Sequence, residues 1–182
     1  MGKHHLKGMG AAAVAWAALA VSGLCSSCDD GGGGGGRTCG MTDLEARLFD
    51  IINDLRRSGT ECGGTPMAPA PALDCDEALV RAARGHSQDM ADNNYFDHTG
   101  LDGSTPPDRF EAAGFTGTGA WGENIAAGPG DAESVLAMWH ASSGHCSNIM
   151  NPSFTVAGVG YGSSASSTYA SYWTLALGSG VP

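Results

Sequence analysis

Lysine is almost absent from this sequence of 182 residues, because only Lys3 and Lys7 are present and both lie near the N-terminus. Beyond them, seven arginines face 19 acidic residues, and the formal net charge of the chain is -10. A surface of this sign repels phosphate backbones and anionic headgroups. The composition therefore argues against nucleic acid as a partner and against a membrane surface that is bound through charge.

Three chemical patterns are also missing. The sequence has no G-x-S-x-G nucleophile motif, and it has no lysine after Lys7 that could serve a Ser-Lys pair. After residue 28 there is no C-x-x-C pair, so a zinc knuckle is not expected. The run Gly117–Gly122 spells G-x-G-x-x-G, but it neither follows a predicted strand nor opens a helix, so it does not indicate a dinucleotide site.

Residues 1–28 are typical of an export signal. The two lysines supply a positive start, and an alanine-rich apolar stretch runs from Met9 to Leu24. Small residues before Cys28 and a flexible polar tract after it resemble a bacterial lipoprotein cleavage site with Cys28 as the lipidated residue. Cys25 stands where such sites usually carry Leu or Val, so ordinary cleavage that discards both cysteines is the alternative. The apolar stretch is short for an uncleaved anchor. We expect an exported chain that is held to a membrane through Cys28.

The remaining chain is predicted to form one domain. Residues 29–41 include six consecutive glycines and are predicted to be a linker, which leaves residues 42–182 for the domain. Export places the remaining cysteines in an oxidising compartment, where a disulfide frame is favoured. These cysteines are Cys39, Cys62, Cys75 and Cys146. Four cysteines allow three pairings, and the residues alone do not choose among them.

The first predicted helix follows the linker. Thr42 and Glu45 have the spacing of a capping box, and an apolar stripe continues towards Gly59. Basic residues in the last turn of a helix suit the negative end of its dipole. Arg56 and Arg57 are therefore predicted to form a solvated helix end rather than a binding patch.

Three more helices are predicted from the same signals. The second runs from about Asp76 to Asn93 and places His86 in its apolar stripe, as a core histidine rather than a ligand. The third opens at Thr105, where Asp108 has a sufficient structural role as a capping acid. Asp131 is predicted to cap the fourth.

Three strands are predicted from alternation and β-branched or aromatic content: Trp121–Ala127, Thr155–Tyr161 and Tyr172–Leu177. Cys62–Pro71 and the Ser/Gly/Asn/Pro-rich stretch before Thr155 are predicted to be loops. Helices gather early in the chain and strands late. This order favours an α+β layered domain rather than a doubly wound parallel sheet.

The central stretch of the sequence is Ala120–Ala127, where Glu123 lies between a tryptophan and alternating apolar residues. A carboxylate in that context is partly buried, and it then needs a cation, a metal or hydrogen bonds to offset its lost hydration. His98 lies in a stretch before it and His145 in a stretch after it. Two imidazoles and one carboxylate can form a zinc site with an open position. The alternative is that Glu123 bonds one or both histidines and fixes the loops to the sheet.

Five motifs occur in an order and at intervals that resemble one protein family. They are His86–Ala91, Tyr95–Gly100, Gly122–Ile125, Trp139 with Gly144–Met150, and Tyr172–Thr174. Together they resemble the bacterial branch of the CAP superfamily. Its domain, also called SCP, is shared by cysteine-rich secretory proteins, antigen five and plant pathogenesis-related class one proteins. The similarity covers roughly residues 42–178.

The resemblance implies a three-layer α-β-α sandwich with a small antiparallel sheet between helices. It also implies a shallow cavity that holds two histidines and two acids, and a divalent cation such as zinc as a candidate cofactor. Matched by motif, the histidines are His98 and His145, and one acid is Glu123. Ser142 stands where the second acid would be, so the set is incomplete unless Asp108 reaches in. The same resemblance implies a disulfide between Cys62 and Cys146, which leaves Cys39 and Cys75 as the remaining pair.

Two functions are carried forward from these observations. The first is a cell-envelope binding module that takes an apolar or lipid ligand, or a partner protein, in a groove between helix and sheet. The alternative is a divalent-metal-dependent protein, hydrolytic or not, centred on His98, Glu123 and His145. A hydrolase that uses Ser142 or Ser143 ranks third, because serine near histidine is common by chance and protease activity in the family is disputed.

Overall fold

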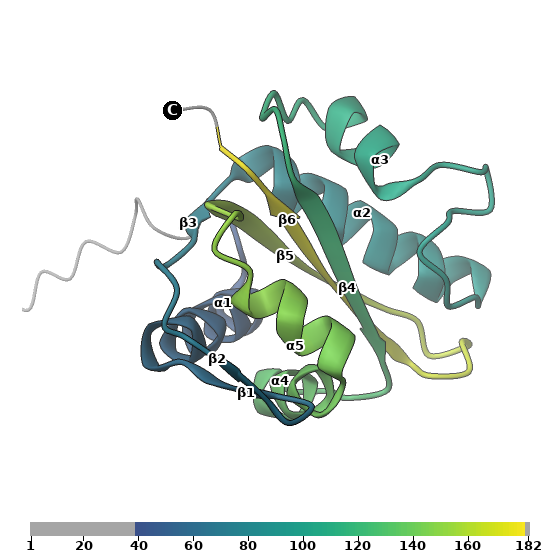
Figure 1. The fold of residues 1–182 in the computed structure, drawn as a ribbon. Helices are drawn as coiled ribbons and strands as arrows, with labels where there is room; N and C mark the ends of the chain where they lie inside the picture. Colours follow the sequence, from purple (N-terminus) through teal and green to yellow (C-terminus); the bar gives the residue numbers. More distant parts are fainter. Residues whose placement is uncertain (1–38, 181–182) are drawn as a thin grey trace, which may run out of the picture. The chain divides into compact units, whose positions relative to one another are not determined.

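A computed structural model describes residues 39–180 of the chain. The predicted export signal, the candidate lipidation site Cys28 and most of the predicted linker lie outside the described residues. The described part is a layered α+β structure, as predicted: helices cover both faces of a four-stranded sheet (Figure 1). No helix within residues 39–180 combines the length and apolar character needed to cross a bilayer.

The helices are α1 (Asp43–Ser58), α2 (Glu77–Asn93), α3 (Pro106–Ala112), α4 (Ala132–Ala141) and α5 (Ser143–Met150). The strands are β1 (Thr60–Cys62), β2 (Thr65–Met67), β3 (Asp74–Cys75), β4 (Trp121–Ala127), β5 (Val156–Ser163) and β6 (Ser171–Gly178). The four predicted helices and three predicted strands are all present. β1 and β2 form a separate hairpin, and β2 lies within Cys62–Pro71, which is predicted from the sequence to be a loop.

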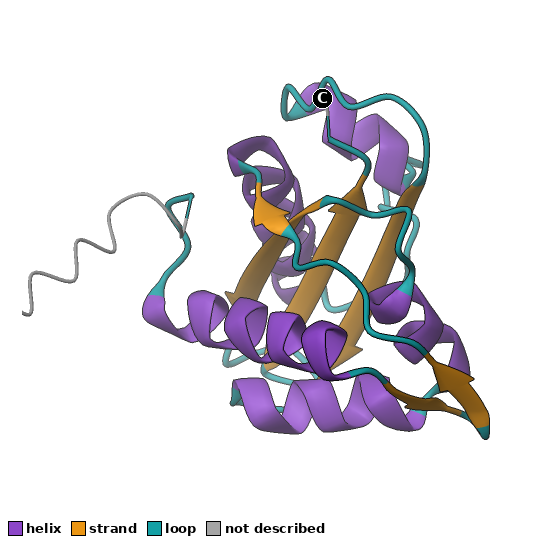
Figure 2. Ribbon diagram, turned by 60° about the vertical axis from the view of Figure 1, so that its left-hand side comes forward, coloured by secondary structure: helices purple, strands orange, loops and turns teal. Residues whose placement is uncertain are grey.

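The main sheet has the strand order β3-β5-β6-β4. β6 pairs antiparallel with both β4 and β5, whereas the two-residue β3 pairs parallel with β5. The expected antiparallel sheet is therefore a mixed one. The difference arises because β3 leads directly into α2. A helical connection of this kind carries the chain back along the sheet, so that a later strand, here β5, can pair parallel with β3. Figure 2 shows α1 and α4 side by side on one face of the sheet, with α2 on the other.

The close packing of α2 on the sheet depends on three glycines. Gly158, Gly160 and Gly162 alternate along β5, so they face the same side. A Cβ atom at any of them would lie between 2.1 and 2.4 Å from backbone atoms of α2. Only glycine therefore lets the helix approach this closely, and the approach fixes the position of His86 on α2.

The last turn of α1 differs from its prediction. The capping box of Thr42 and Glu45 is present, and Gly59 ends the helix with a φ of +70°. Arg57 is exposed as predicted, but Arg56 is fully buried, so its predicted solvent position is wrong. Its guanidinium donates to four carbonyl oxygens at 2.6 to 3.1 Å. Arg56 thereby ties the end of α1 to the loops that lead to β3 and β5.

Besides the β1–β2 hairpin, the helix α5 is not predicted from the sequence. It lies in the Ser/Gly/Asn/Pro-rich stretch before Thr155, for which a loop is predicted. Its serine, glycine and asparagine are poor helix formers. Tertiary contacts compensate: Ile149 and Met150 are buried, and a disulfide joins Cys146 of α5 to Cys62 of β1. The other disulfide joins Cys39 to Cys75. Both are the pairings that the family resemblance implies.

Candidate functional site

Glu123 lies in β4, where every residue from Gly122 to Ala126 is buried, and its side chain is only 2% exposed. Its Oε1 accepts a hydrogen bond from Nδ1 of His98 at 2.8 Å. Its Oε2 accepts one from the guanidinium of Arg109, also at 2.8 Å. A buried carboxylate is costly unless it is paired and hydrogen-bonded, and here both of its oxygens are.

Arg109 is not among the site residues predicted from the sequence. This arginine comes from α3, and it also donates to the carbonyl oxygens of Ser104 and His98, each at 2.9 Å. The guanidinium thus joins α3, the loop after α2 and β4 at one point. One signal could have revealed it: Arg109 is the last lysine or arginine of the chain, and it lies close in sequence to a carboxylate that needs a cation.

His86 of α2 lies beside this group and is 1% exposed, as expected for a core histidine. Its Nε2 is 3.0 Å from the carbonyl oxygen of Asp97 and 4.0 Å from Oε1 of Glu123. Its Nδ1 is buried without a hydrogen-bond partner. Burial lowers the pKa of His86 below its ordinary value, although the nearby charge of Glu123 acts in the opposite direction.

His145 lies on α5, and no hydrogen bond joins its ring to Glu123. Its backbone carbonyl accepts from Nδ2 of Asn124 at 3.0 Å, which fixes α5 against β4. The ring Nδ1 is buried without a partner. Burial, and then the charge of His98, lower the pKa of His145. The structure thus brings His98 and Glu123 into direct contact and leaves His145 outside their hydrogen-bond network.

Neither Asp108 nor Ser142 supplies the second acid that the family pattern would place beside Glu123. Asp108 accepts from the backbone N–H and the hydroxyl of Thr105, so it caps α3 as predicted, and it is exposed to solvent. Ser142 lies at the junction of α4 and α5. Neither Ser142 nor Ser143 is hydrogen-bonded to the His145 ring within residues 39–180.

These residues do not fit a resident divalent cation. Each oxygen of Glu123 already accepts one hydrogen bond, so a metal ion would have to compete with these donors for the carboxylate. Arg109 adds a fixed positive charge 2.8 Å from that carboxylate. Across residues 39–180, no three His, Cys, Asp or Glu side chains are grouped so that they could hold a metal ion. A guanidinium therefore offsets the charge that a metal would offset in the expected site.

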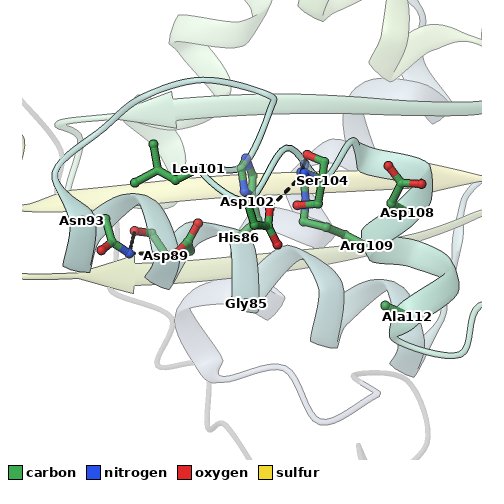
Figure 3. A pocket seen from close by; sticks show the side chains of 10 residues that line it. All are labelled: Gly85, His86, Asp89, Asn93, Leu101, Asp102, Ser104, Asp108, Arg109 and Ala112. Atoms are coloured by element: carbon green, nitrogen blue, oxygen red, sulfur yellow. Dashed lines mark hydrogen bonds between the residues drawn. The ribbon is translucent and has the colours of Figure 1, made fainter.

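Two cavities flank α3. One, of about 430 Å³, lies between α2 and α3 and has His86 and Arg109 in its wall (Figure 3). The other, of about 310 Å³, lies between α3 and the start of β4, and its wall includes Phe110, Phe115 and Trp121. Trp121 is 52% exposed, although it is only two residues from the buried Glu123.

Comparison with known proteins gives consistent matches. The protein YkwD of Bacillus subtilis is 47% identical over 94 residues, which are 52% of this chain and 36% of YkwD. The chain spans about a third of the length of the curated relatives it matches. An extracellular protein containing an SCP domain from Bacillus anthracis superposes with a TM-score of 0.60 at 33% identity, over 74% of this chain and 40% of that one.

A more distant match shows the fold alone. The crystal structure of NaASP2 with Zn²⁺ superposes with a TM-score of 0.53 at 18% identity, over 78% of this chain and 83% of that one. The family described as the cysteine-rich secretory protein family, CAP, matches residues 49–177, which is most of the described domain. The chain belongs to the CAP family.

Proposed function

We propose that this protein is an exported binding module of the cell envelope, and that the groove between α3 and β4 takes the acyl chain of a lipid. One observation carries the proposal: Trp121 is half-exposed at a groove with aromatic walls, whereas the other two tryptophans of the described residues, Trp139 and Trp173, are fully buried. A large aromatic side chain left half in solvent is typical of a binding surface.

The groove has the shape and chemistry of a small ligand site. Its volume of about 310 Å³ is at the lower end of the range for such sites, about 300–1,000 Å³. Pro107 and Phe110 come from α3, Phe115 from the loop after it, and Trp121 from β4. Phe110 and Phe115 meet edge to face with ring centroids 6.4 Å apart, which gives the groove a rigid apolar wall.

The charge of the chain favours an uncharged occupant. The formal net charge is -10, and Glu111 is the charged side chain in the groove wall. An anionic headgroup is repelled by this surface, whereas an acyl chain gains about 0.8 kcal/mol for each buried methylene. Tryptophan suits the boundary between an apolar and a wet phase, so Trp121 is well placed at the mouth of an acyl groove.

The Glu123 network supports the groove from behind. Arg109 of α3 is bonded to Glu123 of β4, and these are the two elements between which the groove lies. The ion pair therefore holds the two walls at a fixed separation. In this proposal, Glu123 positions the groove and does not act as a base or a metal ligand.

Export and anchoring complete the proposal. The similar structure from Bacillus anthracis is described as that of an extracellular protein. The sequence of residues 1–28 supports export with a lipid on Cys28. Cys28→Ser should release the chain from the membrane fraction into soluble form, with Cys25→Ser as the matched control that stays in the membrane. Equal distribution of the two variants would remove the anchor from the proposal.

The groove is tested by titrating the full chain with neutral alkyl maltosides of 8, 10 and 12 carbons, below their micelle concentrations. Each added methylene should tighten binding by about fourfold, which corresponds to about 0.8 kcal/mol. Trp121→Ala should weaken binding at least tenfold. Met138→Ala is the matched control, because Met138 is 45% exposed on α4 and does not line the groove. If the affinity did not depend on the length of the alkyl chain, an acyl occupant would be ruled out, and a protein segment would be the expected occupant instead.

A further inference from the structure

Two residues in the wall of the cavity between α2 and α3 each carry a buried polar atom that no group within residues 39–180 satisfies. Nδ1 of His86 and Nε of Arg109 have no hydrogen-bond partner, and both residues line the cavity (Figure 3). A buried polar atom without a partner is destabilising, so such atoms mark places where a ligand or water completes the structure. Both residues line the cavity together with Leu101, which is 67% exposed.

The hydrogen bonds define what each atom needs. Nε2 of His86 faces the carbonyl oxygen of Asp97, which can only accept, so Nε2 carries the proton of the neutral ring. Nδ1 of His86 is therefore a lone pair that requires a donor. Arginine nitrogens only donate, so Nε of Arg109 requires an acceptor. The cavity wall thus offers one acceptor and one donor.

The rim of the cavity is negative. Asp89 comes from α2, Asp102 from the loop after it and Asp108 from α3. Hydrogen bonds from Ser104 and Thr105 hold the pKa values of Asp102 and Asp108, respectively, below their ordinary range, so both are ionised at neutral pH. The charge of Arg109 offsets part of this rim, because it acts on both Asp102 and Asp108, but the three carboxylates outnumber the one guanidinium, which is also paired with Glu123.

We propose that this cavity binds a protonated amine with a hydroxyl group beside it. The ammonium group donates to Nδ1 of His86 while the three aspartates offset its charge, and the neighbouring hydroxyl oxygen accepts from Nε of Arg109. A plain sugar lacks the charge, and a carboxylate or phosphate is repelled by the rim. The volume of about 430 Å³ is in the range of small-molecule sites.

Two sources share this chemistry: a free amino sugar unit of a polymer and the ethanolamine headgroup of a lipid. This cavity shares no lining residue with the groove beside Trp121. Amine binding and acyl binding therefore succeed or fail separately, and the loss of one leaves the other intact.

The test is an NMR titration of the full chain, labelled with ¹⁵N, with glucosamine and separately with ethanolamine. Glucosamine should bind with a Kd on the order of 1 mM and move the amide signals of Gly85, Asp102 and Ser104. Glucose and N-acetylglucosamine, which lack the charged amine, should bind at least tenfold more weakly. Stronger binding of ethanolamine than of glucosamine would assign the site to a lipid headgroup, and the reverse would assign it to an amino sugar.

Charge reversal provides the matched variants. Asp102→Lys places a positive charge on the exposed rim and should weaken amine binding at least tenfold. Asp92→Lys makes the same change on α2 outside the cavity and should leave the Kd within twofold. Equal binding by the two variants would overturn the proposal, as would equal binding of glucose. The proposal would also fail if Ca²⁺ moved the same signals and displaced glucosamine, because the cavity would then be a cation site.

Discussion

The described domain contains two buried carboxylates that are each paired with an arginine, and they are satisfied in different ways. Glu45 of α1 is 1% exposed and is paired with Arg84 of α2. Glu123 of β4 is 2% exposed at its side chain and is paired with Arg109 of α3. Both pairs connect a helix to another element of the fold. Their surroundings nevertheless differ, and the difference separates a structural site from a candidate functional one.

Around Glu45 the hydrogen bonds are complete. Its oxygens accept from the backbone N–H groups of Thr42 at 2.8 Å and Tyr161 at 2.9 Å, and also from the Thr42 hydroxyl and Arg84. Burial opposes the ionised form of Glu45, but these bonds outweigh it and hold its pKa below the ordinary value. The group has no unmet polar atom, so nothing about it calls for a ligand.

Around Glu123 the partners are side chains, and they leave atoms unsatisfied. Four buried side-chain nitrogen or oxygen atoms within residues 39–180 lack a partner. They are His86 Nδ1, Arg109 Nε, His145 Nδ1 and Tyr172 OH. The first two belong to residues within 4.0 Å of the Glu123 carboxylate, and the third belongs to a histidine whose pKa responds to His98. Burial with complete bonding indicates a structural role, whereas burial with unmet atoms indicates a place for a ligand.

The largest expected effect is on stability at Glu45. Glu45→Ala leaves the Arg84 guanidinium and two backbone N–H groups without their acceptor, so the free energy of unfolding should fall by about 3 kcal/mol. The estimate is taken at the low end because Arg84 is 40% exposed. Urea denaturation of the two proteins measures the difference. A loss below about 1 kcal/mol would show that the complete bonding of Glu45 adds little.

Double mutants should then separate the two pairs. Arg109→Leu alone leaves Glu123 buried without its cation and should cost about 2 kcal/mol, and adding Glu123→Leu should recover most of that. Glu45→Leu combined with Arg84→Leu should recover little, because the N–H groups of Thr42 and Tyr161 stay unpaired. Equal recovery in the two cycles, measured by urea denaturation, would mean that the pairs are equivalent.

Sequence reasoning predicts the parts of this molecule whose causes are local. The helix beginnings at Thr42, Asp76, Thr105 and Asp131 all appear, because a cap depends on a few adjacent residues. Failures occur where distant partners decide. α5 forms from weak helix formers because a disulfide and buried side chains hold it, and Arg56 is buried because carbonyls from distant loops meet it.

The site shows the same division. The pairing of His98 with Glu123 could be predicted from the family motifs and from the need of a buried carboxylate for partners. Arg109 could be suggested as a partner from its position in the sequence, but its contact with Glu123 could not be derived, because that contact depends on how α3 packs against β4. Its presence changes the chemistry of the site, since a cation fixed at the carboxylate takes the place of the divalent cation that one of the two alternatives required.

The two carboxylate regions should also lose stability in different pH ranges. Burial lowers the folded-state pKa values of His86 and His145, so the unfolded chain binds protons first as the pH falls below 6.5. The free energy of unfolding should then fall, by at most about 1.4 kcal/mol per pH unit for each histidine. The stability that Glu45 contributes persists to lower pH, because its folded-state pKa lies below 4.5. That stability is lost only as the pH falls through the folded-state pKa. Urea denaturation from pH 7.5 to 4 tests this order, and His86→Gln should flatten the upper part of the curve.

The smallest expected effect is the shift of the thermal midpoint on addition of zinc. It tests whether Arg109 takes the place of a metal ion at Glu123. In the native chain, zinc at neutral pH should move the thermal midpoint by less than about 1 °C, since Arg109 already offsets the charge of Glu123 and repels a second cation. Arg109→Leu removes that positive charge, so the variant should gain a zinc-dependent rise of roughly 3 °C, equivalent to about 1 kcal/mol for a domain of this size. His145→Ala in the same background should abolish the rise if His145 turns toward the freed carboxylate. A rise of that size in the native chain, lost in His145→Ala, would instead restore the metal site and make Arg109 a neighbour rather than a substitute.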